Sequence, residues 1–163
     1  MKISFFGFQP SKKELTLQAK LSDKRNGLPD SIRKSEPKKE NIKKLTPEKK
    51  ELLTKKLQQI LEGEQLFRNE NLTLDILANQ IQEPRHILSQ FIKEVHGSSF
   101  YDYINYLKIQ YFKRKLISNI ERSISDIYPT AGFKSKTTFY KYFKKFNGQS
   151  PNEFKENLLK SRT

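Results

Sequence analysis

The chain has 163 residues, enough for one domain with a long tail, and its 32 Lys and Arg against 18 Asp and Glu give a formal charge of +14. Cysteine is absent, which excludes disulfide frameworks, thiolate zinc sites and cysteine nucleophiles. No apolar run reaches the roughly 18 residues that a membrane span requires. The composition predicts a polyanion as the partner and the reducing cytoplasm as the compartment.

Residues 1–45 are predicted to be a disordered basic arm or linker. Residues 1–50 carry fourteen Lys and Arg against six acids, and aliphatic side chains are scattered among prolines. Two interpretations stay open for this arm. It is either a solvated tail without a role or a non-specific anchor for phosphate groups.

Residues 46–70 are predicted to hold a lead-in helix and a turn. Thr46 has the character of an N-cap, Pro47 suits the first helical position, and Gly63 is a plausible end after apolar residues at helical spacing. The remaining segment, residues 71–160, is also predicted to be helical, because no part of it alternates apolar and polar residues as a strand would. The fold class is therefore all-α.

Residues 71–160 contain an internal repeat. Apolar residues of two consecutive helices recur fifty or fifty-one residues later, together with the glycine and serine that follow them. The matched pairs include Leu77 with Ile127, Leu88 with Phe139, Ile92 with Phe143, Gly97 with Gly148 and Ser99 with Ser150. A solenoid usually needs three or more repeats. Two copies instead predict two helix-turn-helix units, 71–99 and 123–160, joined by a connector helix over 100–118.

The polar face of the second helix in each unit is the predicted DNA-binding site. A helix that enters a major groove needs cationic and hydrogen-bonding side chains without carboxylates. No acid occurs between Ile127 and Asn152, a stretch with five lysines, whereas Glu83 and Glu94 flank the first such helix and make it less basic. The expected DNA contacts are Arg85, His86, Ser89, Gln90, Lys93, Lys136, Thr137, Thr138, Tyr140, Lys141 and Lys144.

The two histidines do not indicate a metal site. His86 is interpreted as a groove contact or an ordinary exposed helix residue. His96 stands just before Gly97, where a donor or cation would complement the negative end of the helix dipole. No paired acid and base, activated nucleophile or glycine-rich phosphate loop can be assembled from the sequence. We therefore expect no enzyme, no catalytic residue, no cofactor and no metal.

The sequence resembles the AraC/XylS family of bacterial transcriptional regulators over roughly residues 72–154. The motifs are Gly132-Phe133-Lys134-Ser135, Thr138-Phe139, Phe143-Lys144-Lys145 and Gly148-Gln149-Ser150-Pro151-Asn152-Glu153-Phe154. The resemblance implies sequence-specific binding of double-stranded DNA, with both recognition helices in successive major grooves. It also implies activation of transcription, with RNA polymerase as a further partner. Residues 1–45 are too few and too polar for the effector barrel of some members, so the chain is either a stand-alone regulator or the remnant of a longer one.

Three residues depart from the family pattern. Gln82 occupies the first turn where the family usually has glycine, and a left-handed conformation there would cost roughly 1–2 kcal/mol. Pro84 replaces a frequent capping serine. Pro129 falls inside the supporting helix of the second unit, so this helix is expected to be kinked or to start late, with Ser125 as a candidate cap.

One alternative from another class remains, a non-specific basic protein that binds nucleic acid in an architectural or RNA-binding role. The ratio of operator affinity to random-DNA affinity separates the two, since specific regulators typically show a ratio of roughly 10³ or more.

Overall fold

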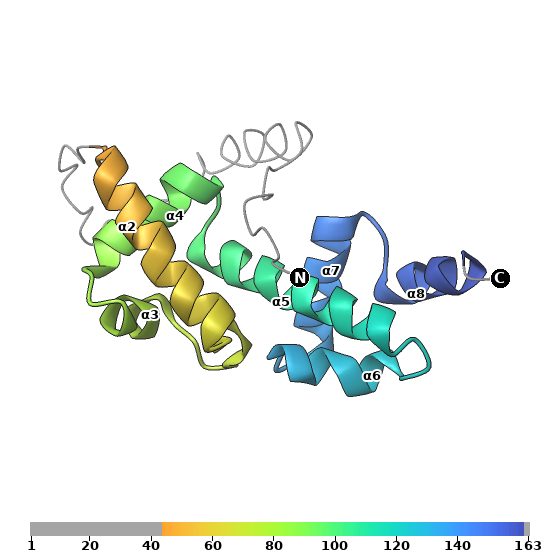
Figure 1. Cartoon of the computed structure of the whole chain (residues 1–163). Helices are drawn as coiled ribbons and strands as arrows, with labels where there is room; N and C mark the ends of the chain where they lie inside the picture. The colour runs from red at the N-terminus through yellow and green to blue at the C-terminus, as the bar shows by residue number, and fades with distance from the viewer. Residues whose placement is uncertain (1–43, 162–163) are drawn as a thin grey trace, which may run out of the picture. The chain divides into compact units, whose positions relative to one another are not determined.

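The computed structural model describes residues 44–161, and all regular structure in this range is helical, which confirms the all-α prediction (Figure 1). The described residues from position 47 onward form one compact unit. The predicted basic arm lies outside the described residues except at its last two positions. None of the helices in the described range combines the length and apolar character needed to cross a membrane.

The elements follow one another with short connections. In chain order they are α2 (Pro47–Gln58), continued by the π-helical η3 (Gln59–Gly63), the 3₁₀ turn η4 (Leu66–Arg68), α3 (Leu74–Gln80), α4 (Arg85–His96), α5 (Phe100–Ser118), α6 (Ile124–Ile127), continued by the 3₁₀ turn η5 (Tyr128–Ala131), α7 (Lys136–Asn147) and α8 (Pro151–Lys160). The first helix-turn-helix is formed by α3 and α4, and the second by α6, η5 and α7.

Serine and threonine side chains begin most of these helices as the sequence predicts. The hydroxyls of Thr73, Ser99 and Ser135 each accept a hydrogen bond from the backbone N–H three residues later. Ser150 forms a full capping box with Glu153 at the start of α8. Each cap satisfies an N–H group that has no partner inside the helix, and such caps contribute about 1 kcal/mol apiece.

The supporting helix of the second unit differs from the prediction at its start. Its cap is Ser123 rather than Ser125, because the Ser123 hydroxyl accepts from the Asp126 N–H at 3.1 Å. The helix tightens into the 3₁₀ turn η5 at Tyr128, which places Pro129 in the first turn of η5. A first-turn N–H needs no partner within the helix, so proline is accommodated there without a lost hydrogen bond.

The connector helix α5 forms the centre of the core. Nine of its residues are buried, including Leu107, Ile109 and Phe112. The Phe112 ring packs at 4.6 Å from that of Phe139 and at 5.7 Å from that of Phe143, measured between ring centroids. Full burial of one such side chain contributes roughly 1.5–3 kcal/mol. This packing fixes the second unit against α5.

Candidate nucleic-acid interface

Helix α7 presents the more basic of the two predicted DNA faces. Phe139 and Phe143 are fully buried, so the remaining face of the helix is turned outward. It carries six of the predicted contacts, of which five are exposed and Tyr140 is half-buried: Lys136, Thr137, Thr138, Tyr140, Lys141 and Lys144.

Two lysines of this face have no ion-pair partner within the described part of the chain. Neither Lys136 nor Lys141 forms an ion pair there, whereas Lys145, on another side of α7, pairs with Asp102 of α5 at 2.7 Å. Lys136 lies over the Tyr140 ring, 5.5 Å from its centroid. Thr138 has a second role, since its hydroxyl accepts from Ser135 at 2.8 Å at the helix start. The face therefore offers cations and hydroxyls to an anionic partner.

Helix α4 carries the other five predicted contacts. Leu88 and Ile92 are fully buried, which leaves the opposite face to solvent. The residues on it are Arg85, His86, Ser89, Gln90 and Lys93, of which only Gln90 is half-buried. Two of these side chains contact acids. The Gln90 amide donates a hydrogen bond to the Glu94 carboxylate at 2.8 Å, and Arg85 forms an ion pair with Asp75, with 3.5 Å between Nη1 and Oδ1. On each of the two helices, the predicted DNA contacts therefore lie together on the face opposite the buried side chains.

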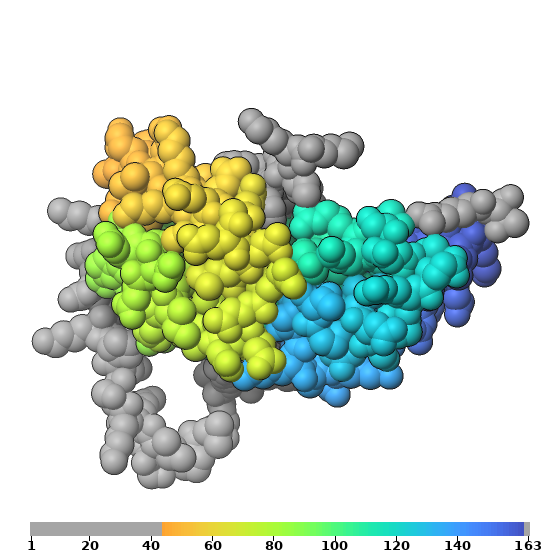
Figure 2. Space-filling model, turned by 60° about the horizontal axis from the view of Figure 1, so that its bottom comes forward, coloured from red at the N-terminus to blue at the C-terminus, as the bar shows by residue number. Residues whose placement is uncertain are grey.

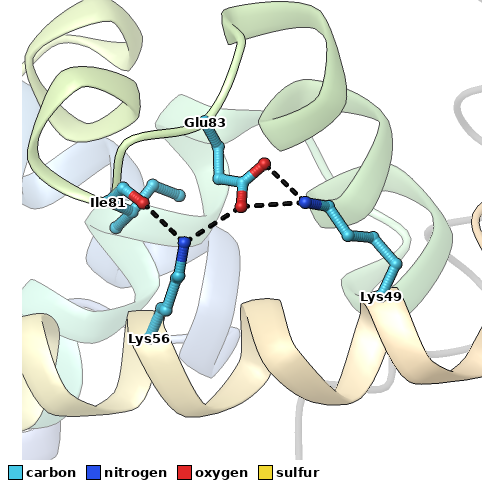
Figure 3. Close-up of polar contacts among 4 residues, drawn as sticks. All are labelled: Lys49, Lys56, Ile81 and Glu83. Atoms are coloured by element: carbon cyan, nitrogen blue, oxygen red, sulfur yellow. Dashed lines mark hydrogen bonds and ion pairs between the residues drawn. The ribbon is translucent and has the colours of Figure 1, made fainter.

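The turn before α4 is stabilised by a cluster of charges that the sequence did not reveal. Figure 3 shows Lys49 and Lys56, both from α2, reaching the carboxylate of Glu83. Lys49 donates to both carboxylate oxygens at 2.7 and 2.9 Å, and Lys56 donates to one of them at 3.0 Å. Lys56 also donates to the Ile81 carbonyl at 3.0 Å. The Glu83 side chain is 7 % exposed, and the hydrogen bond from Lys49 holds the pKa of its carboxyl below the usual range.

This cluster changes the electrostatic interpretation of the first unit. The sequence suggests that Glu83 and Glu94 weaken the positive face of α4. Glu83 instead lies in the charge cluster with α2, and Glu94 pairs with Lys50 at 2.7 Å. Both acids are compensated by lysines of the lead-in helix. The carboxylates beside α4 therefore repel a phosphate backbone less than their positions in the sequence suggest.

The two turns also contain residues with left-handed backbone conformations. Gln82 has a φ of 55°, so the first turn does adopt the conformation that favours glycine. The second turn has Gly132 at a φ of 86°. The buried Lys108 of α5 donates to the Gly132 carbonyl at 2.7 Å, and burial lowers the pKa of this lysine. Pro84 takes the cap position before α4 and makes no side-chain cap.

His96 does not act as the cation that its position suggests. Its ring stacks on Tyr103 of α5 with 4.2 Å between centroids and meets the edge of Phe91 at 6.0 Å. Burial lowers the pKa of His96 to about 4, so the imidazole is neutral at pH 7. It is a half-buried side chain packed against Tyr103 and Phe91, and the helix ends instead at Gly97. In the sequence, the apolar residues at helical spacing near His96 are only a weak signal that its ring packs against neighbouring side chains.

Comparison with known proteins agrees with this architecture. Residues 77–157 match the family model described as a helix-turn-helix domain. The chain is 31% identical over 93 residues to the probable transcription factor PqrA of Proteus vulgaris, a match that covers 57% of this chain and 75% of that protein. It is also 31% identical over 85 residues to the melibiose operon regulatory protein of Escherichia coli K12, but covers only 28% of its length.

Solved structures give the same result. The C-terminal domain of AraT, a response regulator from Geobacillus stearothermophilus, is similar with a TM-score of 0.57 and 26% identity over 71% of this chain and 88% of that chain. A DNA-binding transcriptional dual regulator from Escherichia coli K-12 shares the fold, with a TM-score of 0.53 at 18% identity over 63% and 94% of the two chains. Together with the repeated units described above, these similarities show that the chain belongs to the AraC/XylS family of DNA-binding transcriptional regulators, a family of transcription factors and not of enzymes.

Proposed function

We propose that this regulator binds one continuous site on double-stranded DNA, with α4 and α7 in successive major grooves, and that it activates transcription in the cytoplasm together with RNA polymerase. The outward face of α7 is the observation that best supports binding in a major groove. It combines Lys136 and Lys141, which lack ion pairs with described residues, with hydroxyl groups and no acid. Such a face favours a groove bordered by phosphates.

The length of α5 bears on how the two helices reach the DNA. Its 19 residues rise about 28 Å at 1.5 Å per residue, less than the roughly 34 Å of one helical turn of DNA. The elements that flank α5 supply the missing distance, or the DNA bends toward the protein. We expect protection of about two helical turns of DNA in a footprint.

Individual side chains are assigned different tasks. Lys141, in the middle of the polar face of α7, is proposed to donate to guanine O6 and N7. Gln90 is proposed to bond adenine through both atoms of its amide, after release from Glu94. Lys144, nearer the end of α7, is proposed to contact a phosphate.

Replacement of the two lysines tests these assignments. Lys141→Ala should relax the preference at one or two base pairs, because a lost guanine contact reduces discrimination by about 1–3 kcal/mol. Lys144→Ala should weaken binding about equally on all sequences. Selection of bound sites from random DNA, followed by affinity measurements on the selected and a scrambled site, checks both outcomes. Lys55→Ala on α2 is the charge-matched control. A selected site that binds no better than random DNA would support the non-specific alternative.

The basic arm is proposed to add affinity without sequence preference. Deletion of residues 1–45 should flatten the dependence of the logarithm of affinity on the logarithm of salt concentration, since fewer counterions are released on binding. Titrations at several salt concentrations, with the parent chain as the control, measure this slope. A changed selected site after the deletion would contradict the role as an anchor.

A further inference from the structure

A short segment that precedes the first helix-turn-helix lies against the turn of the second. We call this segment, residues 65–71, the bridging segment; it contains η4 and lies outside the matched range 77–157. The Arg68 Nε donates to the Thr130 carbonyl at 2.9 Å, and Lys134 donates to the Asn71 side chain. Figure 2 shows the yellow surface of this region meeting the blue surface of the second unit.

The backbone contact at this place leaves no room for a side chain. A Cβ added at Gly132 would overlap the Arg68 carbonyl oxygen and would stand 2.6 Å from the carbonyl carbon and 2.8 Å from the Cα of Arg68. The glycine at the end of α7 offers a contrast. Gly148 has a φ of 72°, yet no atom lies within 4 Å of a Cβ added there. Gly132 is thus required both by its conformation and by the contact with η4.

The connector helix completes the contact. Tyr111 of α5 packs edge-on against Phe67 with 5.9 Å between ring centroids, and the Arg68 guanidinium lies 4.8 Å from the centroid of the Tyr111 ring. Lys108, one turn earlier on α5, donates to the Gly132 carbonyl. The bridging segment, α5 and the second turn therefore meet at one place.

We propose that the contact between the bridging segment and Gly132 fixes the orientation of α4 relative to α7, and so restricts the spacing between the two halves of the DNA site. Without this contact the two units would be joined mainly along α5. Gly132 would then determine specificity through position, without touching a base. The consequence for DNA rests on the two-groove binding proposed above, whereas the fixed orientation does not.

The first measurement uses the chain without DNA. Because it has no native cysteine, spin labels at Asn79→Cys on α3 and Glu156→Cys on α8 report the distance between the two units by pulsed electron resonance. Both positions are exposed and belong to neither predicted DNA face. We expect a narrow distance distribution in the parent and in Gly148→Ala, and a clearly wider one in Gly132→Ala. An unchanged width in a folded Gly132→Ala protein overturns the proposal.

A second variant covers the case in which Gly132→Ala does not fold. Arg68→Ala combined with Asn71→Ala removes the side-chain bonds to Thr130 and Lys134, and both replaced residues are exposed. Circular dichroism should show unchanged helix content in this double variant. The distance distribution should widen as in Gly132→Ala, and a distribution as narrow as that of the parent contradicts the proposal.

The second measurement uses DNA sites in which one base pair is inserted or deleted between the two halves. The parent and Gly148→Ala should lose affinity by about tenfold or more on these sites, because one added base pair rotates one half relative to the other. Gly132→Ala should tolerate the altered spacing better. If it remains as selective as the parent, the contact does not set the spacing. If the parent itself ignores spacing, the two-groove proposal fails, while the spin-label distances still test the fixed orientation.

Discussion

The two helix-turn-helix units have the same order of elements but stabilise their turns by different means. The first turn contains Gln82 in a left-handed conformation and is held by Glu83, whose carboxylate pairs with two lysines of α2. The second contains Gly132, and its stability depends on the close approach of the η4 backbone. One turn thus relies on a charged side chain and the other on the absence of any side chain.

The difference teaches that neither turn is stabilised by its own unit alone. In both cases one partner lies before residue 72, in α2 for the first turn and in η4 for the second. A comparison limited to the repeated helices would miss both partners. Variants that disturb one turn and spare the other therefore test whether the two arrangements are independent.

The largest effect on stability is expected from Glu83→Ala. This change leaves Lys49 and Lys56, each only about a third exposed, without their carboxylate. Hydrogen bonds to charged groups contribute about 1.5–3 kcal/mol, and we expect a decrease in the free energy of unfolding of about 1–3 kcal/mol, measured by urea denaturation. The pKa of the Glu83 carboxyl is lowered, so this contribution is complete above the ordinary glutamate pKa and is lost as the pH falls through the folded-state value.

The matched control for this prediction is Glu51→Ala. Glu51 pairs with Lys55 on the same helix, but the two side chains are 68 % and 72 % exposed, respectively. Exposed pairs contribute little, so the control should change stability far less than Glu83→Ala. Equal losses in the two variants would show that the cluster at the first turn has no special role.

The second prediction concerns pH dependence in the first unit. The folded-state pKa of His96 is lowered to about 4, so the unfolded chain binds more protons between that value and about 6.5. Stability is therefore complete above pH 6.5 and decreases as the pH falls toward 4. Between pH 6.5 and 5 we expect a decrease of about 1 kcal/mol, after allowance for partial exposure of the ring.

Replacement of this histidine should remove the decrease. His96→Phe retains an aromatic ring beside Tyr103 and cannot titrate, so its stability should be nearly constant between pH 6.5 and 5. The equivalent position in the second unit is Asn147, whose amide donates to the Phe143 carbonyl at 2.9 Å. If His96→Phe shows the same pH dependence as the parent, the decrease originates elsewhere.

The smallest effect is expected from Gln82→Gly, which makes the first turn resemble the second. A left-handed conformation costs a non-glycine residue roughly 1–2 kcal/mol, and part of this gain is offset by the greater freedom of glycine in the unfolded chain. We expect a net increase in the free energy of unfolding of about 0.5–1 kcal/mol. Gln80→Gly, at the end of α3, should act in the opposite direction. A loss of stability in Gln82→Gly would contradict the assigned strain.

Much of the fold could be predicted because it depends on local signals. Thr73, Ser99 and Ser135 cap the helices that follow them, and the repeat of apolar residues locates both units. At Gln82 the glycine usual in the family indicates where a left-handed conformation would occur, and the structure has one there. Caps and periodicity act over a few residues, so the sequence displays them directly.

The features that could not be predicted depend on distant residues. The pairing of Glu83 with Lys49 spans 34 positions, and no periodicity connects the two. Lys108 and Gly132 are also far apart in the sequence, and no periodicity connects them either. The start of α6 is a local exception, since Pro129 indicates a later start than the cap at Ser123, while the change to a 3₁₀ turn accommodates this proline. The DNA contacts themselves remain predictions, supported by the exposure of their side chains.

The buried connector α5 has a consequence for attempts to isolate one helix-turn-helix unit. Its Tyr103 packs against His96 of the first unit, while its Phe112 packs against Phe139 and Phe143 of the second. A cut within this helix would expose apolar surface on both fragments. Neither unit is therefore a portable module, and a chimaeric regulator built from this chain should exchange only the outward faces of α4 and α7 on an intact scaffold.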